Sequence, residues 1–126
     1  MNVPEGLRYT REHEWVKIEG NVAVIGITDY AQGELGDVVF VELPPIGKSV
    51  KQMEAFGTIE AVKAVSELFA PVSGVVKEIN TNLEKDSSVI NKDPYGAGWM
   101  IKVEKINPAE VSALLDAASY RKLLED

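Results

Sequence analysis

The stretch Gly57-Thr58-Ile59-Glu60-Ala61-Val62-Lys63-Ala64-Val65-Ser66-Glu67 is β-prone and mostly apolar, and one lysine interrupts it. Lys63 lies about midway between two candidate strands, at 55–61 and 66–70. A tight turn at this position presents the lysine side chain at the tip of a β-hairpin. The return strand leads into Ala70-Pro71-Val72-Ser73-Gly74, whose proline and glycine are typical of a chain turn.

A turn lysine is ordinarily just a solvated residue, and that interpretation applies to most lysines. Three features distinguish Lys63: small residues flank it, acidic residues bracket the turn, and the turn segment 70–74 follows at a defined offset. The flanking and bracketing residues are Glu60, Ala61, Ala64 and Glu67. The lysines that occur in strand or turn contexts without this arrangement are Lys17, Lys48, Lys77 and Lys102.

The rest of the first hundred residues consists of short β-rich runs separated by turn residues, which predicts a mainly β sandwich or barrel. Expected strands lie at 14–18, 22–27, 38–43, 49–51, 75–80 and 98–103, in addition to the two beside Lys63. Glu19-Gly20-Asn21 predicts a hairpin connection between the first two. Thr28 is a capping-type residue and predicts a short helix near 28–34.

The last twenty residues change to a helical pattern. Asn107-Pro108-Ala109-Glu110 combines a cap residue with proline at the first helical position. Apolar residues then recur at helical spacing, which predicts a C-terminal helix near 108–124 that packs on the β body. We see no linker or low-complexity tract, so we expect one domain over 1–126 with its β core at about 7–104.

Composition excludes several classes of function. The chain has 126 residues and a net charge of −7, which argues against nucleic acid and anionic membrane as partners and suits docking on basic protein surfaces. It has no cysteine and one histidine, so a cysteine nucleophile, a disulfide, an iron–sulfur cluster and a multi-histidine metal site are all excluded.

Sequence signatures of catalysis are also missing. There is no G-x-S-x-G serine motif and no P-loop, and Gly96-Ala97-Gly98 is interpreted as turn glycines before a strand. These observations favour a carrier protein without independent turnover over an enzyme.

Several motifs resemble the glycine cleavage system H protein family. Glu60 to Ala64 together with Ala70 to Gly74 is similar to the hairpin that carries the lipoyl-lysine in that family. Three other segments match the family in the same order, and together the matches cover most of residues 7 to 124. They are Tyr9 to Val16, Gly26 to Pro44 (apart from Gly33 and Glu34) and Asp93 to Lys102.

The resemblance implies a barrel-sandwich hybrid, with two packed antiparallel sheets and the lysine at a hairpin turn. It implies lipoate bound to Lys63 as an amide, with Glu60, Val62 and Ala64 as the other cofactor-binding residues. The working sulfurs then belong to the cofactor, which agrees with the absence of cysteine. The implied partners are the P protein (a pyridoxal-phosphate glycine decarboxylase), the T protein (an aminomethyltransferase), the L protein (dihydrolipoyl dehydrogenase) and lipoylating enzymes.

The resemblance further implies that the arm shuttles the aminomethyl group of glycine from the P protein to the T protein and is then reoxidised by the L protein. Such a group is cationic and open to attack by water, so its protection requires a dry site with oxygen acceptors. We hypothesise that Glu14 and Glu67 are these acceptors; the alternative is that both are solvated surface acids. His13, Trp15 and Trp99 are interpreted as packing or hydrogen-bonding residues rather than ligands.

Two departures from the family pattern and several alternatives stay open. The family usually has Ser where this chain has Ala61, and often Asp where it has Glu67. Alternative functions are a lipoyl or octanoyl donor in a lipoate relay, a biotinyl carrier domain, and an unmodified interaction domain. Biotinyl domains usually place the lysine between two methionines, whereas its neighbours here are Val62 and Ala64. Because no targeting segment precedes the first motif, we expect a bacterial cytoplasmic protein, or a mitochondrial-matrix protein if the source is eukaryotic.

Overall fold

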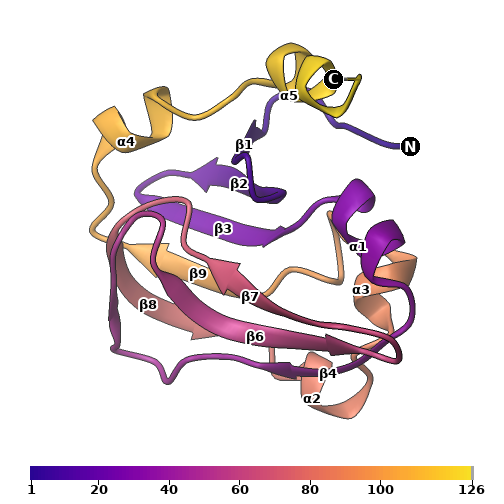
Figure 1. The fold of residues 1–126 in the computed structure, drawn as a ribbon. Helices are drawn as coiled ribbons and strands as arrows, with labels where there is room; N and C mark the ends of the chain where they lie inside the picture. Colours follow the sequence, from indigo (N-terminus) through magenta and orange to yellow (C-terminus); the bar gives the residue numbers. More distant parts are fainter. Residues whose placement is uncertain (126) are drawn as a thin grey trace.

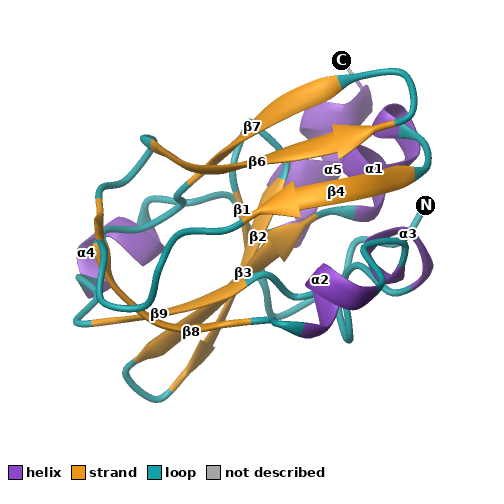
Figure 2. Cartoon of the chain, turned by 90° about the horizontal axis from the view of Figure 1, so that it is seen from below, coloured by secondary structure: helices purple, strands orange, loops and turns teal. Residues whose placement is uncertain are grey.

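The computed structural model describes residues 1–125 and consists mainly of short antiparallel strands in two sheets (Figures 1 and 2). The larger sheet has six strands in the order β1-β2-β3-β9-β8-β5, and the smaller has three in the order β4-β6-β7. The larger sheet is formed by β1 (Arg8–Tyr9), β2 (Glu14–Glu19), β3 (Val22–Ile27), β5 (Ser49–Val50), β8 (Gly74–Ile79) and β9 (Ile101–Glu104). The smaller is formed by β4 (Val38–Glu42), β6 (Ala55–Ala61) and β7 (Val65–Phe69).

The two sheets pack face to face around one large apolar cluster. The six-stranded sheet contributes Val16 and Ile25, and the three-stranded sheet contributes Val41, Ile59 and Leu68. The prediction of a mainly β fold with two packed antiparallel sheets is confirmed. A second cluster, around Tyr9, Trp15 and Tyr120, lies on the other face of the larger sheet.

The helices lie at the margins of the sheets (Figure 1). They are α1 (Asp29–Leu35), α2 (Asn82–Lys85), α3 (Val89–Lys92), α4 (Pro108–Ser112) and α5 (Ala117–Glu125). Helix α1 confirms the short helix expected near 28–34, and the Thr28 side chain accepts the N–H of Ala31, as a cap should. None of these helices, in the described part of the chain, has the length and apolar character needed to span a bilayer.

The C-terminus is helical as expected, but it forms two helices rather than one continuous helix over 108–124. Leu115 interrupts the helical hydrogen bonding because its backbone exchanges two hydrogen bonds with Tyr9, at 2.8 and 2.9 Å. Asp116 then starts α5, because its carboxylate accepts the N–H of Ser119 at 2.8 Å. The sequence pattern shows the helical spacing but not the competing backbone partner.

Three elements were not expected from sequence, and one strand begins three residues later than expected. The strand predicted at 98–103 begins only at Ile101, because the backbone N–H of Gly98 donates back to the carbonyl of Asp93 in a turn. The strand β1 and the helices α2 and α3 are additional. Helix α3 has a clear role, because its Asn91 side chain accepts the N–H of Val38 and donates to the carbonyl of Gly36, at 2.9 and 2.8 Å.

The end of α1 depends on a glycine conformation. Gly36 has φ 81° and ψ −156°, a region that is essentially restricted to glycine, and its N–H donates to the carbonyl of Gln32. A Cβ at this position would also lie 3.4 Å from Cε and 3.9 Å from Nζ of Lys63. Gly36 therefore ends the helix and lies beside the lysine side chain, with which a Cβ would make an ordinary van der Waals contact.

We expect Gly36→Ala to lower the free energy of unfolding by about 1–3 kcal/mol, because alanine does not adopt this backbone conformation without strain. Gly33→Ala is the matched control: it lies within α1, and a Cβ there meets nothing within 4 Å. That control should leave stability unchanged or raise it by roughly 0.5–1 kcal/mol. Denaturant unfolding of both variants measures the difference, and equal stability of the two would contradict this role of Gly36.

Candidate functional site

Lys63 lies in the turn between β6 and β7, where two backbone hydrogen bonds define the chain path. The N–H of Ala61 donates to the carbonyl of Ala64 at 2.7 Å, and the N–H of Val62 donates to the carbonyl of Asp37 at 3.0 Å. Lys63 is exposed, and no carboxylate of residues 1–125 lies within 4.0 Å of its ammonium group. Its amine is therefore accessible for modification by another protein.

A cleft of about 320 Å³ opens beside this turn, between α1, the β1–β2 connection and β7. Leu35 and Ser66 are among its lining residues, and Gly36, which follows Leu35, lies against the Lys63 side chain. We call it the Glu14 cleft; its lining residues are Glu12, His13, Glu14, Ile27, Tyr30, Ala31, Glu34, Leu35, Ile59, Ser66, Glu67 and Leu68. Its walls combine apolar side chains with four carboxylates.

Glu14 is the most deeply placed of these carboxylates, with only 2% of the residue exposed. One carboxylate oxygen accepts the hydroxyl of Thr10 at 2.5 Å, and the other accepts the backbone N–H of Phe69 at 3.3 Å. Burial raises the pKa of Glu14 to about 7, against the smaller opposing effect of these two hydrogen bonds. The residue therefore changes charge near neutral pH.

The two acids proposed as acceptors from sequence, Glu14 and Glu67, line the same cleft. Glu67 is exposed on β7, whereas Glu14 is buried at the start of β2. The alternative of a solvated surface acid therefore does not apply to Glu14. The structure thus brings together two residues that are 53 positions apart in the sequence.

The other residues predicted around the lysine do not line the cleft. Glu60 is exposed on β6, where it pairs in register with Phe40 on β4 and Val65 on β7. Val62 is 76% exposed beside Lys63, and Ala64 is half-buried with its carbonyl in the turn hydrogen bond. These three residues surround the lysine rather than the cleft.

Three residues of the cleft wall were not predicted from the sequence. Tyr30 and Glu34 line it from α1, and Glu12 lines it from the β1–β2 connection. The first two are four residues apart on one helix, so they share a face, and that spacing is the signal that was present in the sequence. Nothing local to Glu12 indicated its position.

The aromatic residues act in packing and hydrogen bonding, as predicted. His13 bonds through Nδ1 to the hydroxyl of Tyr120 at 2.8 Å, and its ring packs against Tyr30 with centroids 4.7 Å apart. Trp15 is buried, and its indole N–H donates to the carbonyl of Pro94 at 3.0 Å. Trp99 is half-buried beneath the ammonium of Lys102.

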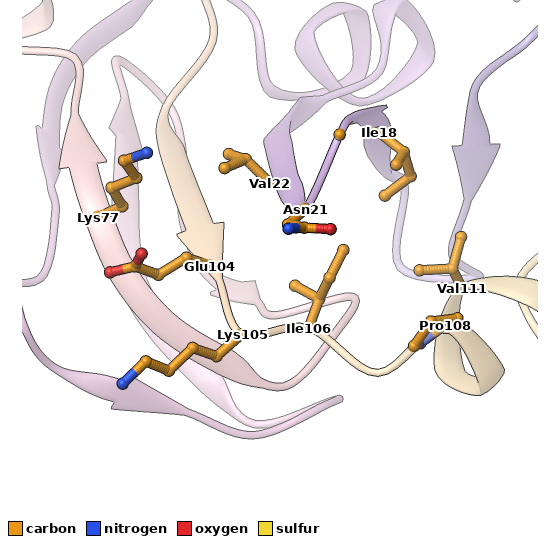
Figure 3. A pocket seen from close by; sticks show the side chains of 10 residues that line it. Ile18, Asn21, Val22, Lys77, Glu104, Lys105, Ile106, Pro108 and Val111 are labelled. Carbon is orange, nitrogen blue, oxygen red and sulfur yellow. The ribbon is translucent and has the colours of Figure 1, made fainter.

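A second, larger recess of about 510 Å³ lies at the opposite end of the molecule, by α4 and the β2–β3 turn (Figure 3; compare Figure 1). Its walls are mainly apolar, with Ile18, Val22 and Ile106 among them, and Lys77 and Lys105 lie at its side. Within residues 1–125 there is no group of three potential metal-ligating side chains here or elsewhere. The Glu14 cleft, not this recess, adjoins Lys63.

The segment Ala70 to Gly74 also lies away from Lys63, beyond the far end of β7. The Ser73 backbone N–H and hydroxyl donate to the carboxylate of Glu110 on α4, at 2.7 and 2.9 Å. A Cβ at Gly74 would lie 2.4 Å from the carbonyl oxygen of Glu104, so only glycine permits this strand contact. The segment thus joins α4 to the β body and does not contact the lysine turn.

Comparison with known proteins shows that the chain is similar to one family. The family model for the glycine cleavage H-protein matches residues 7–126. The chain is 57% identical to the glycine cleavage system H protein of Symbiobacterium thermophilum, over 94% of this chain and 93% of that protein. It is 55% identical to that of Chlorobium luteolum, over 98% of each. Its fold is similar to the crystal structure of a glycine cleavage system H protein from Mycobacterium marinum, with a TM-score of 0.89, 39% identity, and coverage of 98% of this chain and 100% of that one.

The burial of Glu14 predicts a specific pH dependence of stability. Because its folded-state pKa of about 7 lies above the ordinary value of 4.5, the protonated form is favoured by folding. Its contribution is complete below pH 4.5 and is lost as the pH rises through 7. We expect the wild type to lose stability relative to Glu14→Gln by on the order of 3 kcal/mol between pH 4.5 and pH 8.5.

Denaturant unfolding at these two pH values measures that difference. Glu67→Gln is the control for removing a carboxylate from the same cleft, because Glu67 is exposed. A wild-type-minus-Glu14→Gln difference that is the same at both pH values would show that Glu14 does not titrate as described.

Proposed function

The chain belongs to the glycine cleavage H-protein family, and we propose that it is the lipoyl-carrying subunit of that system, with no turnover of its own. The observation that carries this proposal is the position of Lys63: an exposed amine on a short turn, next to a cleft with apolar and acidic walls. In this proposal Lys63 is the modified residue, and Glu60, Val62 and Ala64 form the surface that a lipoylating enzyme recognises.

The residues around Lys63 fit such a group. The buried side chains of Ile27, Ile59 and Leu68 give the Glu14 cleft an apolar lining suited to a hydrocarbon arm. Gly36, at the end of α1, lies within van der Waals reach of the lysine stem. Lipoate, bound to Lys63 as an amide, supplies a disulfide–dithiol pair on a flexible arm that can carry the aminomethyl group derived from glycine.

Within the cleft, we propose that the carboxylates of Glu14 and Glu67 accept hydrogen bonds from this cationic group. Glu14 is well suited to it, because a carboxylate that ionises near pH 7 is favoured in its charged form when a cation approaches. Buried apolar walls exclude water from the carbon that hydrolysis would attack. Glu12 and Glu34 add negative charge at the same cleft.

The surface around the lysine turn supports docking to other proteins. Four apolar side chains are more than half exposed there, namely Val39, Phe40, Val62 and Val65. Val39 and Phe40 lie at a register shift between Val38 and Phe40, where β4 has one extra residue opposite β6. Exposed apolar residues rimmed by Glu42 and Glu60 fit a partner with an apolar centre and a basic rim. We propose that the lipoylating enzyme uses this face first, and that the P, T and L proteins then use it in that order for the glycine reaction.

Modification of Lys63 is tested by intact mass after incubation with a lipoate ligase, lipoate and ATP. We expect one added lipoyl group on the wild type and on Lys77→Arg, a control that changes an exposed lysine on β8, and none on Lys63→Arg. Unchanged mass of folded wild type would contradict the carrier proposal. Addition of biotin by a biotin ligase would instead indicate a biotinyl domain.

The role in glycine cleavage is tested by adding a P protein and glycine to the lipoylated chain. We expect glycine-dependent loading of the arm; a chain that is lipoylated but never loaded would fit the relay donor instead. Once loaded, Glu14→Gln should hydrolyse about tenfold faster than wild type, because one charge-assisted hydrogen bond is lost. Glu54→Gln, which changes an exposed acid outside the cleft, should behave as wild type. Equal hydrolysis of all three would exclude Glu14 as an acceptor.

A further inference from the structure

The hydroxyl of Tyr120 lies outside the Glu14 cleft and forms hydrogen bonds with a residue of each of two segments that build its walls. Tyr120 lies on α5 and is fully buried, with its ring stacked on Tyr9 at a centroid distance of 4.7 Å. Its hydroxyl oxygen is 2.8 Å from Nδ1 of His13 and 2.7 Å from the hydroxyl of Thr28. One oxygen from the C-terminal helix therefore contacts two segments that are 15 residues apart.

Thr28 determines the position of the α1 wall. Its side chain caps α1 by accepting the N–H of Ala31 at 3.2 Å. The helix that begins there presents Tyr30, Ala31, Glu34 and Leu35 to the cleft. A shift of Thr28 therefore moves the whole wall.

His13 determines the position of the opposite wall, because it directly precedes Glu14. It has φ 72°, a left-handed conformation that is uncommon for a residue other than glycine. Its backbone N–H donates to the carbonyl of Thr10, and its carbonyl accepts the N–H of Thr28. The hydrogen bond to Tyr120 and the packing against Tyr30 fix the ring itself.

The three groups form a hydrogen-bond chain. In the one order that gives every hydroxyl proton an acceptor among these partners, Thr28 accepts from Ala31 and donates to Tyr120, and Tyr120 donates to Nδ1 of His13. This order requires a neutral imidazole with its proton on Nε2. Burial also lowers the pKa of His13, against the opposing effect of the nearby Glu12 and Glu34 carboxylates.

We propose that Tyr120 is a positioning residue of the Glu14 cleft, whose hydroxyl holds the His13 ring and the Thr28 side chain in place and sets the tautomer of His13. The proposal rests on the function proposed above for the cleft. The proposal also assigns a role to α5, which contributes no residue to the lining of the cleft. A neutral His13 is useful there because a second cation beside the carried amine would repel it.

The contact itself is tested on the unmodified chain by nitrogen NMR of the histidine ring. His13 is the only histidine, so its two ring nitrogens are assigned without ambiguity. We expect the Nε2–H tautomer in the wild type and a mixture of tautomers in Tyr120→Phe. Tyr9→Phe is the matched control, because it removes a buried hydroxyl from the same stacked pair, bonded instead to the carbonyl of Pro4.

The consequence for the arm is tested by the hydrolysis half-life of the loaded chain. We expect Tyr120→Phe to shorten it about fivefold, the effect of one hydrogen bond, and Tyr9→Phe to leave it unchanged. Thr28→Val breaks the other half of the bridge and should also shorten the half-life, which provides a second measurement if Tyr120→Phe folds poorly.

Two outcomes would overturn the proposal: an unchanged His13 tautomer in Tyr120→Phe, or half-lives in both bridge variants that match Tyr9→Phe. Failure of the underlying function looks different. In that case the wild type itself would hydrolyse as fast as a lipoamide that carries the same group free in solution.

Discussion

The turn that presents Lys63 is anchored from outside its own hairpin, by the hydrogen bond from the N–H of Val62 to the carbonyl of Asp37. Asp37 lies between the glycine that ends α1 and the first residue of β4, and the Asn91 side chain holds both of those neighbours. The lysine is therefore placed relative to α1, one wall of the cleft, and not only relative to its own strands. An arm attached to such an anchored turn starts from a defined point beside the cleft.

Local signals in the sequence predicted the features that depend on local physics. Alternating β-prone residues and the turn around Lys63 indicated the hairpin, and Thr28 and Asn107 indicated two helix starts that the structure contains. Glu14 and Glu67 were predicted as acceptors from their chemistry and from their positions, near the start of a strand and four residues after Lys63. The two residues meet in one cleft because β2 and β7 belong to different sheets that pack against each other. No local sequence pattern indicates that packing.

What could not be predicted depends on contacts between distant segments. The division of the C-terminal helix follows from a bridge between Tyr9 and Leu115, 106 positions apart. The depth of Glu14, and hence its titration near neutral pH, follows from packing against Thr10 and the end of β7. The role of Tyr120 is invisible in the helical pattern, because a buried aromatic residue on an amphipathic helix ordinarily indicates packing alone.

The hydrogen bond between Glu14 and Phe69 has a further consequence for how the protein behaves at high concentration. Strand β7 is the outermost strand of its sheet, so one side of its backbone has no strand partner, and unprotected edges of this kind promote self-association and aggregation. The Glu14 carboxylate occupies the N–H of Phe69, the last donor of the strand, and Glu67 places a charge in its middle. The same two acids that face the cleft thereby make the β7 edge less suited to pairing with another strand.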